Sequence, residues 1–499
     1  MFVSYILTFL MCIIAYTWYH ARKALSYWSD RNVPVMQPKF PLGNLGEVGK
    51  KHFGSVIGET YLKLKGKGPF AGFYMLLSPV VVPLDLDFIK DILIKDFQYF
   101  ADRKIFYNEK DDPLSAHLFA IRGEKWRSLR QQLTPTFTSG KMKMMFPLVI
   151  GQAKNLQKYI DKHITESPTE FKNACIRFTA DVIGISAFGL ECRALSDEDS
   201  EILKVGKQFF SFNTALKQIK FFFSMVCEDW ARQLGLRFNN PEMEEFFMRV
   251  IKETVKQREA GIIDRNDFMK HLLEIKNFPK DDDVLNNLTF NELAAQAFVF
   301  FFAGFETSST TMEFTLCNFA LYPVYQKRAR QEVRDVMKKY NGELTYEAVQ
   351  DLTYLRQCID ETLRIYSPCI LLFRQCVEDY KVPNTDLIIE KGTQVLVPIV
   401  GIQMDPDIYP NPHVFDPDRF TSENINNRHP MSYFPFGDGP RNCIGKRFAL
   451  IQVTVGLAYI LNHFKFTMNS KTKLPLEIDP TDIPIHVKGG AWFNVEKVE

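Results

Sequence analysis

The sequence predicts a mainly α-helical protein with a minor β part, folded as one large domain behind an N-terminal apolar segment. Helical periodicity dominates from about residue 120 to 370, where few Gly or Pro interrupt the pattern. Short β-branched runs such as 79–83 (PVVVP) lie between about 45 and 100 and predict a small sheet. The 499 residues are 46% hydrophobic and 24% charged, which excludes long disorder. The net charge of +2 argues against nucleic acid as a partner bound through bulk charge.

The N-terminal segment is long and apolar enough to cross a membrane. Residues 1–21 contain no Asp, Glu, Lys or Arg, and the run 2–19 approaches the roughly 20 residues that a bilayer requires. Arg22 and Lys23 follow at once, and basic residues place this side in the cytosol. A cleaved signal peptide is the alternative, although its charged start and small-residue cleavage site are not clear here. We therefore expect a membrane anchor at 1–21, a basic and Pro-rich hinge at 22–44 and a globular domain at 45–499.

Further elements are predicted along the globular domain. Residues 289–292 (TFNE) form a capping box, and a helical pattern continues from there to Pro323. The segment 391–398 (KGTQVLVP) predicts a turn into a strand. Seven prolines between 403 and 445 exclude long helices there, and 444–464 is predicted to be an amphipathic helix.

One cysteine does not fit a simple core position. Nine Cys are scattered without a C-x-x-C pair, which leaves no basis for a zinc ribbon or a thioredoxin-type site. Cys443, however, lies between a Gly-rich loop and a predicted helix, near Arg441, Lys446 and Arg447. Loop N–H groups, the helix N-terminus and these cations are expected to favour the thiolate. No general base and no further zinc ligands are spaced around it, so a lone thiolate best suits haem, which brings four equatorial ligands itself.

The segment 436–448 resembles the haem-binding loop of the cytochromes P-450. Phe436, Gly439, Arg441, Cys443 and Gly445 stand at the positions of the family's F-x-x-G-x-R-x-C-x-G motif. The resemblance implies the cytochrome P-450 fold, a large helical domain with a small β-sheet region, around haem b (iron protoporphyrin IX). It also implies that Cys443 is the axial ligand of the haem iron, that Phe436 packs beside the sulfur and that Arg441 pairs with a haem propionate.

Residues 361–364 (ETLR) have the E-x-x-R pattern. Alone it carries little information, because 124–127 (EKWR) has the same spacing and such pairs are common on helix surfaces. Arg419, within 417–420 (PDRF), follows about 55 residues later, as it does in the family. The resemblance therefore implies a buried cluster of Glu361, Arg364 and Arg419 that holds the haem loop.

Three other residues carry predictions about the cofactor. Trp126 and Arg130 share a helical face, which by itself indicates only a core residue beside a surface residue. The resemblance implies that both contact haem propionates, together with Arg374, because guanidinium groups suit carboxylates.

Residues 303–307 (AGFET) lie at the centre of the helix predicted before Pro323. The residues alone leave two interpretations open: a polar turn facing solvent, or a groove over Gly304 in which Glu306 and Thr307 organise water and protons. The family's A-G-x-[DE]-T oxygen-activation motif favours the second.

The predicted pocket is apolar, although plain core packing competes at each position. By resemblance its residues are Phe106, Leu118, Phe119, Phe209, Phe212, Val299, Phe302, Ala303, Ile370 and Leu371. The run 221–223 (FFF) is interpreted as a second membrane-touching patch, with core packing as the alternative.

The resemblance is strongest to the insect microsomal family-6 type, a xenobiotic-metabolising group that shares a clan with the vertebrate 3A enzymes. Residues 108–119 carry much of it. The chain departs from the common pattern in three places: the hinge lacks Pro-Pro-Gly-Pro, 366–370 has fewer prolines, and Gln403 stands where His is frequent. Because 366–370 is a predicted pocket wall, substrate preference cannot be transferred.

The function implied is that of a haem-thiolate monooxygenase at the endoplasmic reticulum membrane, with its catalytic domain on the cytosolic face. It would insert oxygen from O2 into a lipophilic substrate, a xenobiotic or an endogenous lipid or hormone. No dinucleotide-binding fingerprint is present, so electrons are expected from NADPH through a separate cytochrome P-450 reductase, with cytochrome b5 as a further donor. Two alternatives are a non-oxygenating haem-thiolate enzyme and a haem-based sensor.

Overall fold

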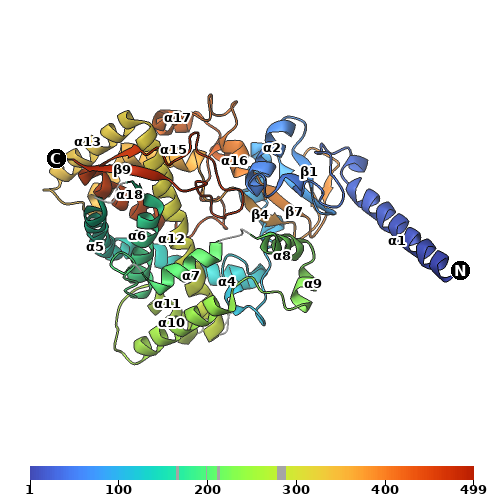
Figure 1. The fold of residues 1–499 in the computed structure, drawn as a ribbon, viewed down its shortest axis with the longest axis horizontal. Helices are drawn as coiled ribbons and strands as arrows, with labels where there is room; N and C mark the ends of the chain where they lie inside the picture. Colours follow the sequence, from blue (N-terminus) through green and yellow to red (C-terminus); the bar gives the residue numbers. More distant parts are fainter. Residues whose placement is uncertain (165–167, 198, 211–213, 278–287, 499) are drawn as a thin grey trace.

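Helices make up most of the computed structural model, which confirms the predicted fold class (Figure 1). The structure describes all residues except 165–167, 198, 211–213, 278–287 and 499, and the side chains of 207–210 and 215 are also not described. The α-helices are α1 (Phe2–Leu25), α2 (Phe53–Leu64), α3 (Leu86–Lys90), α4 (Gly123–Leu133), α5 (Ser139–His163), α6 (Phe171–Ile183), α7 (Glu201–Phe210), α8 (Ala215–Val226), α9 (Glu228–Gln233), α10 (Pro241–Glu259), α11 (Phe268–Asn277), α12 (Phe290–Leu321), α13 (Pro323–Lys339), α14 (Tyr346–Asp351), α15 (Thr353–Ile365), α16 (Ile399–Gln403), α17 (Ser422–Asn426) and α18 (Lys446–His463).

Nine short strands form three sheets at the edges of the helical body. They are β1 (Phe70–Met75), β2 (Ser78–Pro83), β3 (Thr169–Glu170), β4 (Leu372–Gln375), β5 (Tyr380–Lys381), β6 (Ile388–Ile389), β7 (Gln394–Val397), β8 (Phe464–Met468) and β9 (Trp492–Lys497). Short 3₁₀ or π turns lie at Ser29–Arg31, Leu45–Glu47, Asp91–Lys95, Phe97–Phe100, Pro113–Ser115, Thr134–Phe137, Gly184–Phe188, Pro417–Phe420 and Pro430–Ser432.

The largest sheet has the strand order β1-β2-β7-β4. The hairpin of β1 and β2 pairs Phe70 with Pro83, and β7 lies parallel to β2 with Val80 beside Gln394. The strand predicted after Gly392 is therefore confirmed as β7, which joins distant parts of the chain. This sheet lies between the helical body and α1 (Figure 1).

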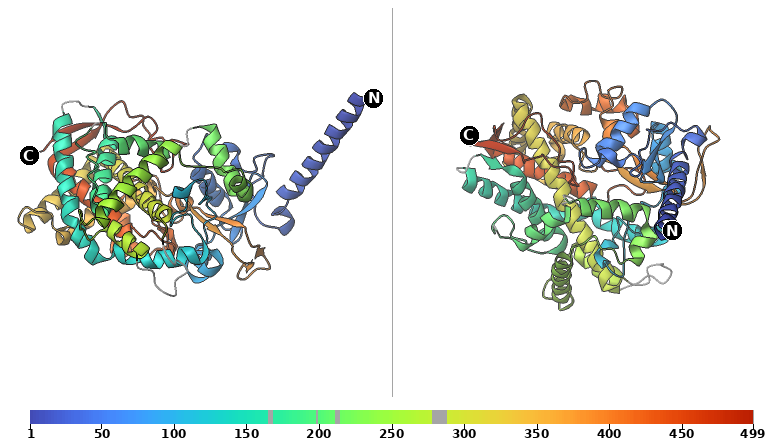
Figure 2. Two further views of the ribbon diagram at one scale, coloured as in Figure 1. Left: turned by 90° about the horizontal axis from the view of Figure 1, so that it is seen from below. Right: turned by 45° about the vertical axis from the view of Figure 1, so that its right-hand side comes forward.

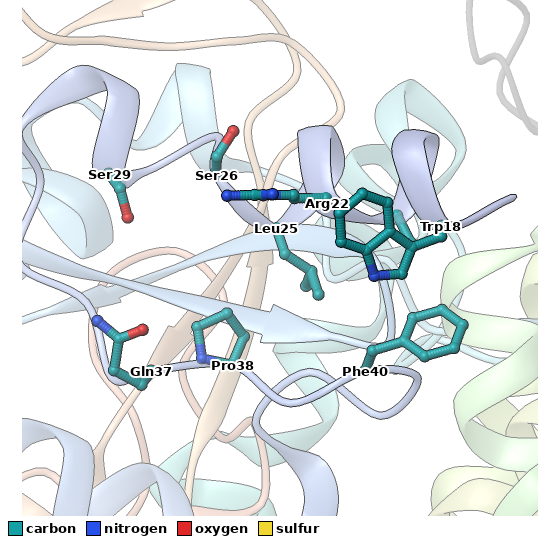
Figure 3. Close-up of a pocket in the computed structure, with 9 residues that line it drawn as sticks. Trp18, Arg22, Leu25, Ser26, Ser29, Gln37, Pro38 and Phe40 are labelled. Carbon is teal, nitrogen blue, oxygen red and sulfur yellow. The ribbon is translucent and has the colours of Figure 1, made fainter. Parts of the chain in front are cut away.

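Helix α1 projects from the body in every view (Figures 1 and 2). The apolar segment Phe2–Arg31 is long enough to cross a membrane, and its most apolar window has none of its residues buried. A shallow pocket lies where α1 meets the Pro-rich segment, with the Trp18 ring above Phe40 and the Arg22 side chain extended toward Ser26 (Figure 3). The Arg22 guanidinium lies 5.3 Å from the Trp18 ring centre.

The segment predicted as a hinge is partly built into the domain. Trp28 is 1% exposed, its indole Nε1 donates to the Phe73 carbonyl (3.3 Å), and its ring contacts Phe70. Val35 also bridges to Gly72 of β1. The connection after α1 is therefore held against the sheet. The sequence did not predict this packing, because a single Trp outside a periodic pattern does not indicate burial.

Helix α12 runs through the helical body, where it packs against α6, α18, α15 and β8 (Figure 1). The predicted capping box is confirmed: the Thr289 hydroxyl accepts from the Glu292 N–H, and the Glu292 carboxylate accepts from the Thr289 N–H. The helix ends at Leu321, before Pro323, as predicted.

Helix α18 is placed correctly by the sequence but is not amphipathic. Its residues from Ile451 to Leu461 are all buried, because α18 is surrounded by α5, α6, α12 and α13. Its polar residues Gln452 and Thr454 are buried as well. The run 221–223 in α8 is half-buried, and Phe221 and Phe222 pack against the core. The rings of Phe222 and Phe53 lie 5.3 Å apart.

We expect Gly456→Ala in α18 to destabilise the protein by about 1–3 kcal/mol through overpacking. A Cβ there would lie 2.6 Å from Phe178 and 2.7 Å from Met312. The matched control is Gly151→Ala in α5, where a Cβ meets nothing within 4 Å. The free energy of unfolding of this control should rise by up to about 1 kcal/mol, because alanine has a higher helix propensity than glycine. Denaturant unfolding of both variants measures the difference, and equal effects would show that α18 is not tightly packed.

Candidate active site

The loop before α18 folds back tightly around Cys443. The Cys443 N–H donates to the Phe436 carbonyl (2.8 Å), and the Gly437 N–H donates to the Phe434 carbonyl (2.8 Å). Gly439 has φ +71°, and a Cβ at this residue would lie 1.8 Å from the Leu93 carbonyl oxygen. Glycine is therefore required here both by backbone conformation and by the close approach of residues 93–94.

The Cys443 side chain lies deep in the protein but is exposed to an internal space. Burial raises the pKa of the Cys443 thiol, although the Gly445 N–H and the charges of Arg130, Arg103 and Lys446 act in the opposite direction. The expectation that these surroundings alone favour the thiolate is therefore wrong, because desolvation outweighs the cations. A bound metal cation would supply the missing stabilisation, since thiols coordinate metals as thiolates.

The middle of α12 has one face that is open in the same way. Val299 and Thr307 are half-buried and Ala303 is exposed, within a helix that is otherwise almost wholly buried from Leu293 to Ala320. These three positions are four residues apart and share one face. Gln452 of α18 donates to the Gly304 carbonyl (2.8 Å), which fixes the helix that follows Cys443 against this part of α12.

A cluster of buried arginines lies beside the Cys443 loop. Arg374 and Arg441 are 0% and 2% exposed, and Arg103 donates to the Arg441 carbonyl (2.8 Å). Burial lowers the pKa of Arg103 to about 10, of Arg374 to about 9 and of Arg441 to about 8, and their mutual repulsion adds to this. Among the described residues, the carboxylate contact of this cluster is one long bond from Arg441 to Asp102 (3.5 Å).

Several guanidinium nitrogens of this cluster have no hydrogen-bond partner among the described residues. They are Nε and Nη2 of Arg374 and Nε and Nη1 of Arg441. Buried cations without acceptors are unfavourable, so these arginines suit a ligand that carries anionic groups. Two carboxylates beside a metal-binding thiol fit haem, whose propionates would accept from these arginines.

The other residues predicted to contact propionates lie in this cluster. The Trp126 ring packs 3.9 Å below the Arg441 guanidinium, and Arg130 donates to the Asn442 side chain (2.8 Å). Arg103 was missed by the sequence analysis, because no motif surrounds it and only the fold brings it to the loop. Phe436 is half-buried, and its ring packs against the core.

The predicted cluster is present: Glu361 and Arg364 of α15 are fully buried, and Arg419, from the turn Pro417–Phe420, has a side chain that is 13% exposed. Glu361 holds Arg364 in two parallel bonds (2.7 and 2.8 Å), and its Oε1 lies 3.5 Å from Arg419 Nε. Arg364 also donates to the Gln403 and Pro412 carbonyls (2.8 and 2.7 Å). Gln403 donates to the Arg364 carbonyl (3.0 Å), so this departure from the common His still joins the two segments.

Glu306 and Thr307 face different sides of α12. Thr307 is on the open face, where its hydroxyl donates to the Ala303 carbonyl (2.8 Å). Glu306 is 4% exposed, and its carboxylate lies 3.0 Å from the Lys172 ammonium of α6. Neither residue faces bulk solvent as a surface turn would.

The predicted pocket residues divide into open and packed positions. Phe119 is 41% exposed and Ala303 is exposed, whereas Leu118, Ile370 and Leu371 are buried. Phe302 packs among Phe247, Phe298, Phe301 and Phe305, and Phe106 packs on Phe238, as the core interpretation expects. The side chain of Phe209 and the whole of Phe212 lie outside the described residues.

Comparison with known sequences agrees with this geometry. The sequence profile described as cytochrome P-450 matches residues 33–491. The chain is 42% identical to Probable cytochrome P-450 6a14 of Drosophila melanogaster over 490 residues, covering 95% of this chain and 96% of the relative. It is 41% identical to cytochrome P-450 6A1 of Musca domestica over 503 residues, covering 100% and 99%.

The chain therefore belongs to the cytochrome P-450 family. It is a haem b monooxygenase, an oxidoreductase, and its similar relatives are family-6 members of flies.

We expect Glu361→Gln to lower the free energy of unfolding by about 3–5 kcal/mol, because two buried arginines lose their shared carboxylate. The matched control is Glu124→Gln, which removes an exposed pair of the same spacing (Glu124–Arg127, 2.9 Å). The free energy of unfolding of this control should stay within about 0.5 kcal/mol of the parent value. Urea unfolding tests both, and a similar small effect in the two variants would mean that the cluster does not stabilise the domain.

Proposed function

We propose that this chain is the terminal oxygenase of a membrane-bound electron-transfer system that oxidises a lipophilic small molecule with O2. The observation that carries the proposal is the cationic, acceptor-poor cluster beside the deep Cys443 thiol. Haem b, when bound, supplies the iron centre at which dioxygen is activated. Cys443 would ligate the iron, and Arg103, Arg374 and Arg441 would hold the propionates, with Arg130 and Trp126 supporting them.

We assign proton transfer to two residues of α12, Thr307 and Glu306. Thr307 presents a hydroxyl at the open face, where it can hold a water molecule while keeping its bond to the Ala303 carbonyl. Glu306 is the nearest acid in the sequence and is placed behind this face. General acid catalysis by positioned groups contributes roughly 10²–10⁴-fold in enzymes.

The substrate side of the proposed site is apolar. Phe119, Val299 and Ala303 border the open space and would exclude water from a bound lipophilic molecule. The substrate class proposed is a xenobiotic such as a plant toxin or insecticide, or an endogenous lipid or hormone.

Electrons are proposed to come from NADPH through a separate reductase that docks near the Cys443 loop, with cytochrome b5 as a second donor. Four cations, Lys125, Arg127, Lys446 and Arg447, are candidates for this docking surface. Lys125 is paired with Glu109 and Glu292 (both 2.8 Å), and Arg127 is paired with Glu124. Lys446 and Arg447 are exposed, and within the described part of the chain no carboxylate is paired with them. These two residues are therefore the better candidates for the docking surface.

The membrane location proposed is the endoplasmic reticulum, with the domain on the cytosolic face. Three observations support it: the uncovered apolar face of α1, the basic residues Arg22 and Lys23 that follow, and the cysteines at described positions, all of which are free. The pocket of Arg22, Trp18 and Phe40 lies at the level where such a helix would leave the bilayer (Figure 3).

We expect Arg447→Glu to raise the KM for reductase several-fold and to weaken its dependence on salt, because an exposed attractive charge is reversed. Arg127→Glu is the matched control, since Arg127 is already paired with Glu124. Steady-state turnover at several reductase and salt concentrations measures both. Equal changes in the two variants would place the docking surface elsewhere.

The proposed activity predicts that the purified chain with haem, reductase and NADPH incorporates one atom of isotopically labelled O2 into a lipophilic product. A panel of plant toxins, insecticides, fatty acids and sterols covers the proposed classes. Mass spectrometry reads the label, and Cys443→Ser should abolish it. Product formed without NADPH would indicate a non-oxygenating haem-thiolate enzyme, and haem binding without turnover would indicate a sensor.

A further inference from the structure

The pocket between the end of α1 and the Pro-rich segment has a volume of about 340 Å³ (Figure 3). This volume is at the lower end of the roughly 300–1,000 Å³ that small-molecule sites have. One wall comes from the end of α1 and the residues just after it, and the other comes from residues 37–40. The lining residues are Trp18, Ala21, Arg22, Leu25, Ser26, Ser29, Gln37, Pro38 and Phe40.

Arg22 brings a positive charge to this pocket. Among the described residues it forms no ion pair, whereas Arg31, the next arginine along the chain, pairs with Glu390 (3.1 Å). The lining contains no Asp or Glu, and the nearby acid Asp30 accepts a hydrogen bond from the Ser26 hydroxyl (2.7 Å). Arg22 therefore suits an anionic group that enters the pocket.

The pocket is polar at one end and apolar at the other (Figure 3). The Ser29 hydroxyl and the Gln37 amide lie at the polar end, and neither is hydrogen-bonded to another described residue. At the apolar end the Trp18 ring lies above Phe40, and these side chains are 57% and 61% exposed. An amphipathic molecule with an anionic end matches this arrangement.

The direction of this polarity is that of a lipid in a bilayer. Trp18 lies about one turn before Arg22 on α1 and is therefore deeper in the apolar segment. Interfacial Trp and the basic residues that follow it mark the level of the lipid head groups. The end of α1 is also fixed to the domain, because Trp28 is 1% exposed and donates to the Phe73 carbonyl (3.3 Å).

We propose that this pocket binds a phospholipid whose head group carries a net negative charge. The phosphate would lie against Arg22, Ser29 and Gln37, because a guanidinium binds phosphate oxygens through paired N–H groups. The first carbons of the acyl chains would lie on Trp18 and Phe40. A choline head group would add a cation that no carboxylate of the lining can pair with. The inference rests on the proposed membrane location and adds the lipid class that is bound there.

Lipid binding is measured on the whole chain in detergent micelles by native mass spectrometry, in which each bound lipid adds its own mass. We expect phosphatidylserine to be retained at several-fold lower concentration than phosphatidylcholine. Soluble glycerophosphoserine has the same head group without acyl chains and should not be retained at these concentrations. Equal retention of the two phosphatidyl lipids, or of glycerophosphoserine and phosphatidylserine, would overturn the inference.

Arg22→Gln should weaken the binding of phosphatidylserine several-fold. Lys23→Gln is the matched control, because Lys23 is exposed and carries the same charge but does not line the pocket. If both variants lose the same affinity, the lipid is attracted only by the summed charge near the bilayer surface, and the inference is wrong.

Phe40→Ser tests the apolar end and should also weaken the binding of phosphatidylserine. Leu42→Ser is its control, because Leu42 is 46% exposed in the same segment but lies outside the pocket. An unchanged affinity in Phe40→Ser would contradict the inference, since the acyl chains would then lie elsewhere.

Flotation of the parent chain with vesicles of phosphatidylcholine and phosphatidylserine separates this inference from the proposed membrane location. Flotation depends on the apolar segment of α1 and not on Arg22 alone. A parent chain that floats, together with equal lipid binding in Arg22→Gln and Lys23→Gln, contradicts the pocket alone. A parent chain that does not float contradicts the membrane location and this inference with it.

Discussion

The structure depends on a charge imbalance beside a single thiol. Cys443 lies where burial opposes its ionisation, and Arg374 and Arg441 lie near it with nitrogens that have no acceptor in the part of the chain that the structure describes. Each feature alone is unfavourable for folding. Together they fit one ligand, a metal held in a planar ring that carries two carboxylates. The carboxylates would neutralise the arginines, and the metal would stabilise the thiolate.

The rest of the fold holds this unfavourable arrangement in place. The Glu361–Arg364 pair ties α15 to the carbonyls of residues 403 and 412, and Arg419 joins from the segment after them. Gln452 connects α18 to the middle of α12. The segments on both sides of the thiol loop are therefore fixed, residues 403–419 to α15 and α18 to α12. Gly439 allows the loop itself to lie against residues 93–94.

Local pattern and motif were enough to predict much of this arrangement. The capping box predicted the start of α12, and the family resemblance implied a cluster of Glu361, Arg364 and Arg419 that the structure contains. The missed features depend on contacts between distant segments. Arg103 and Lys172 carry no motif, and the burial of Trp28 depends on β1. Residues 451–461 of α18 are buried because helices from distant parts of the chain pack around them. The ionisation of Cys443 was misjudged because a sequence shows nearby charges but not desolvation.

The central claim is that Cys443 supplies a thiolate to haem iron, and the absorption spectrum of the reduced, carbon-monoxide-bound protein tests it most directly. The account predicts the long-wavelength Soret band from which the cytochromes P-450 take their name, and its loss in Cys443→Ser. A band at the shorter wavelength of haem without a thiolate ligand in the native protein, or an unchanged long-wavelength band in Cys443→Ser, would contradict it.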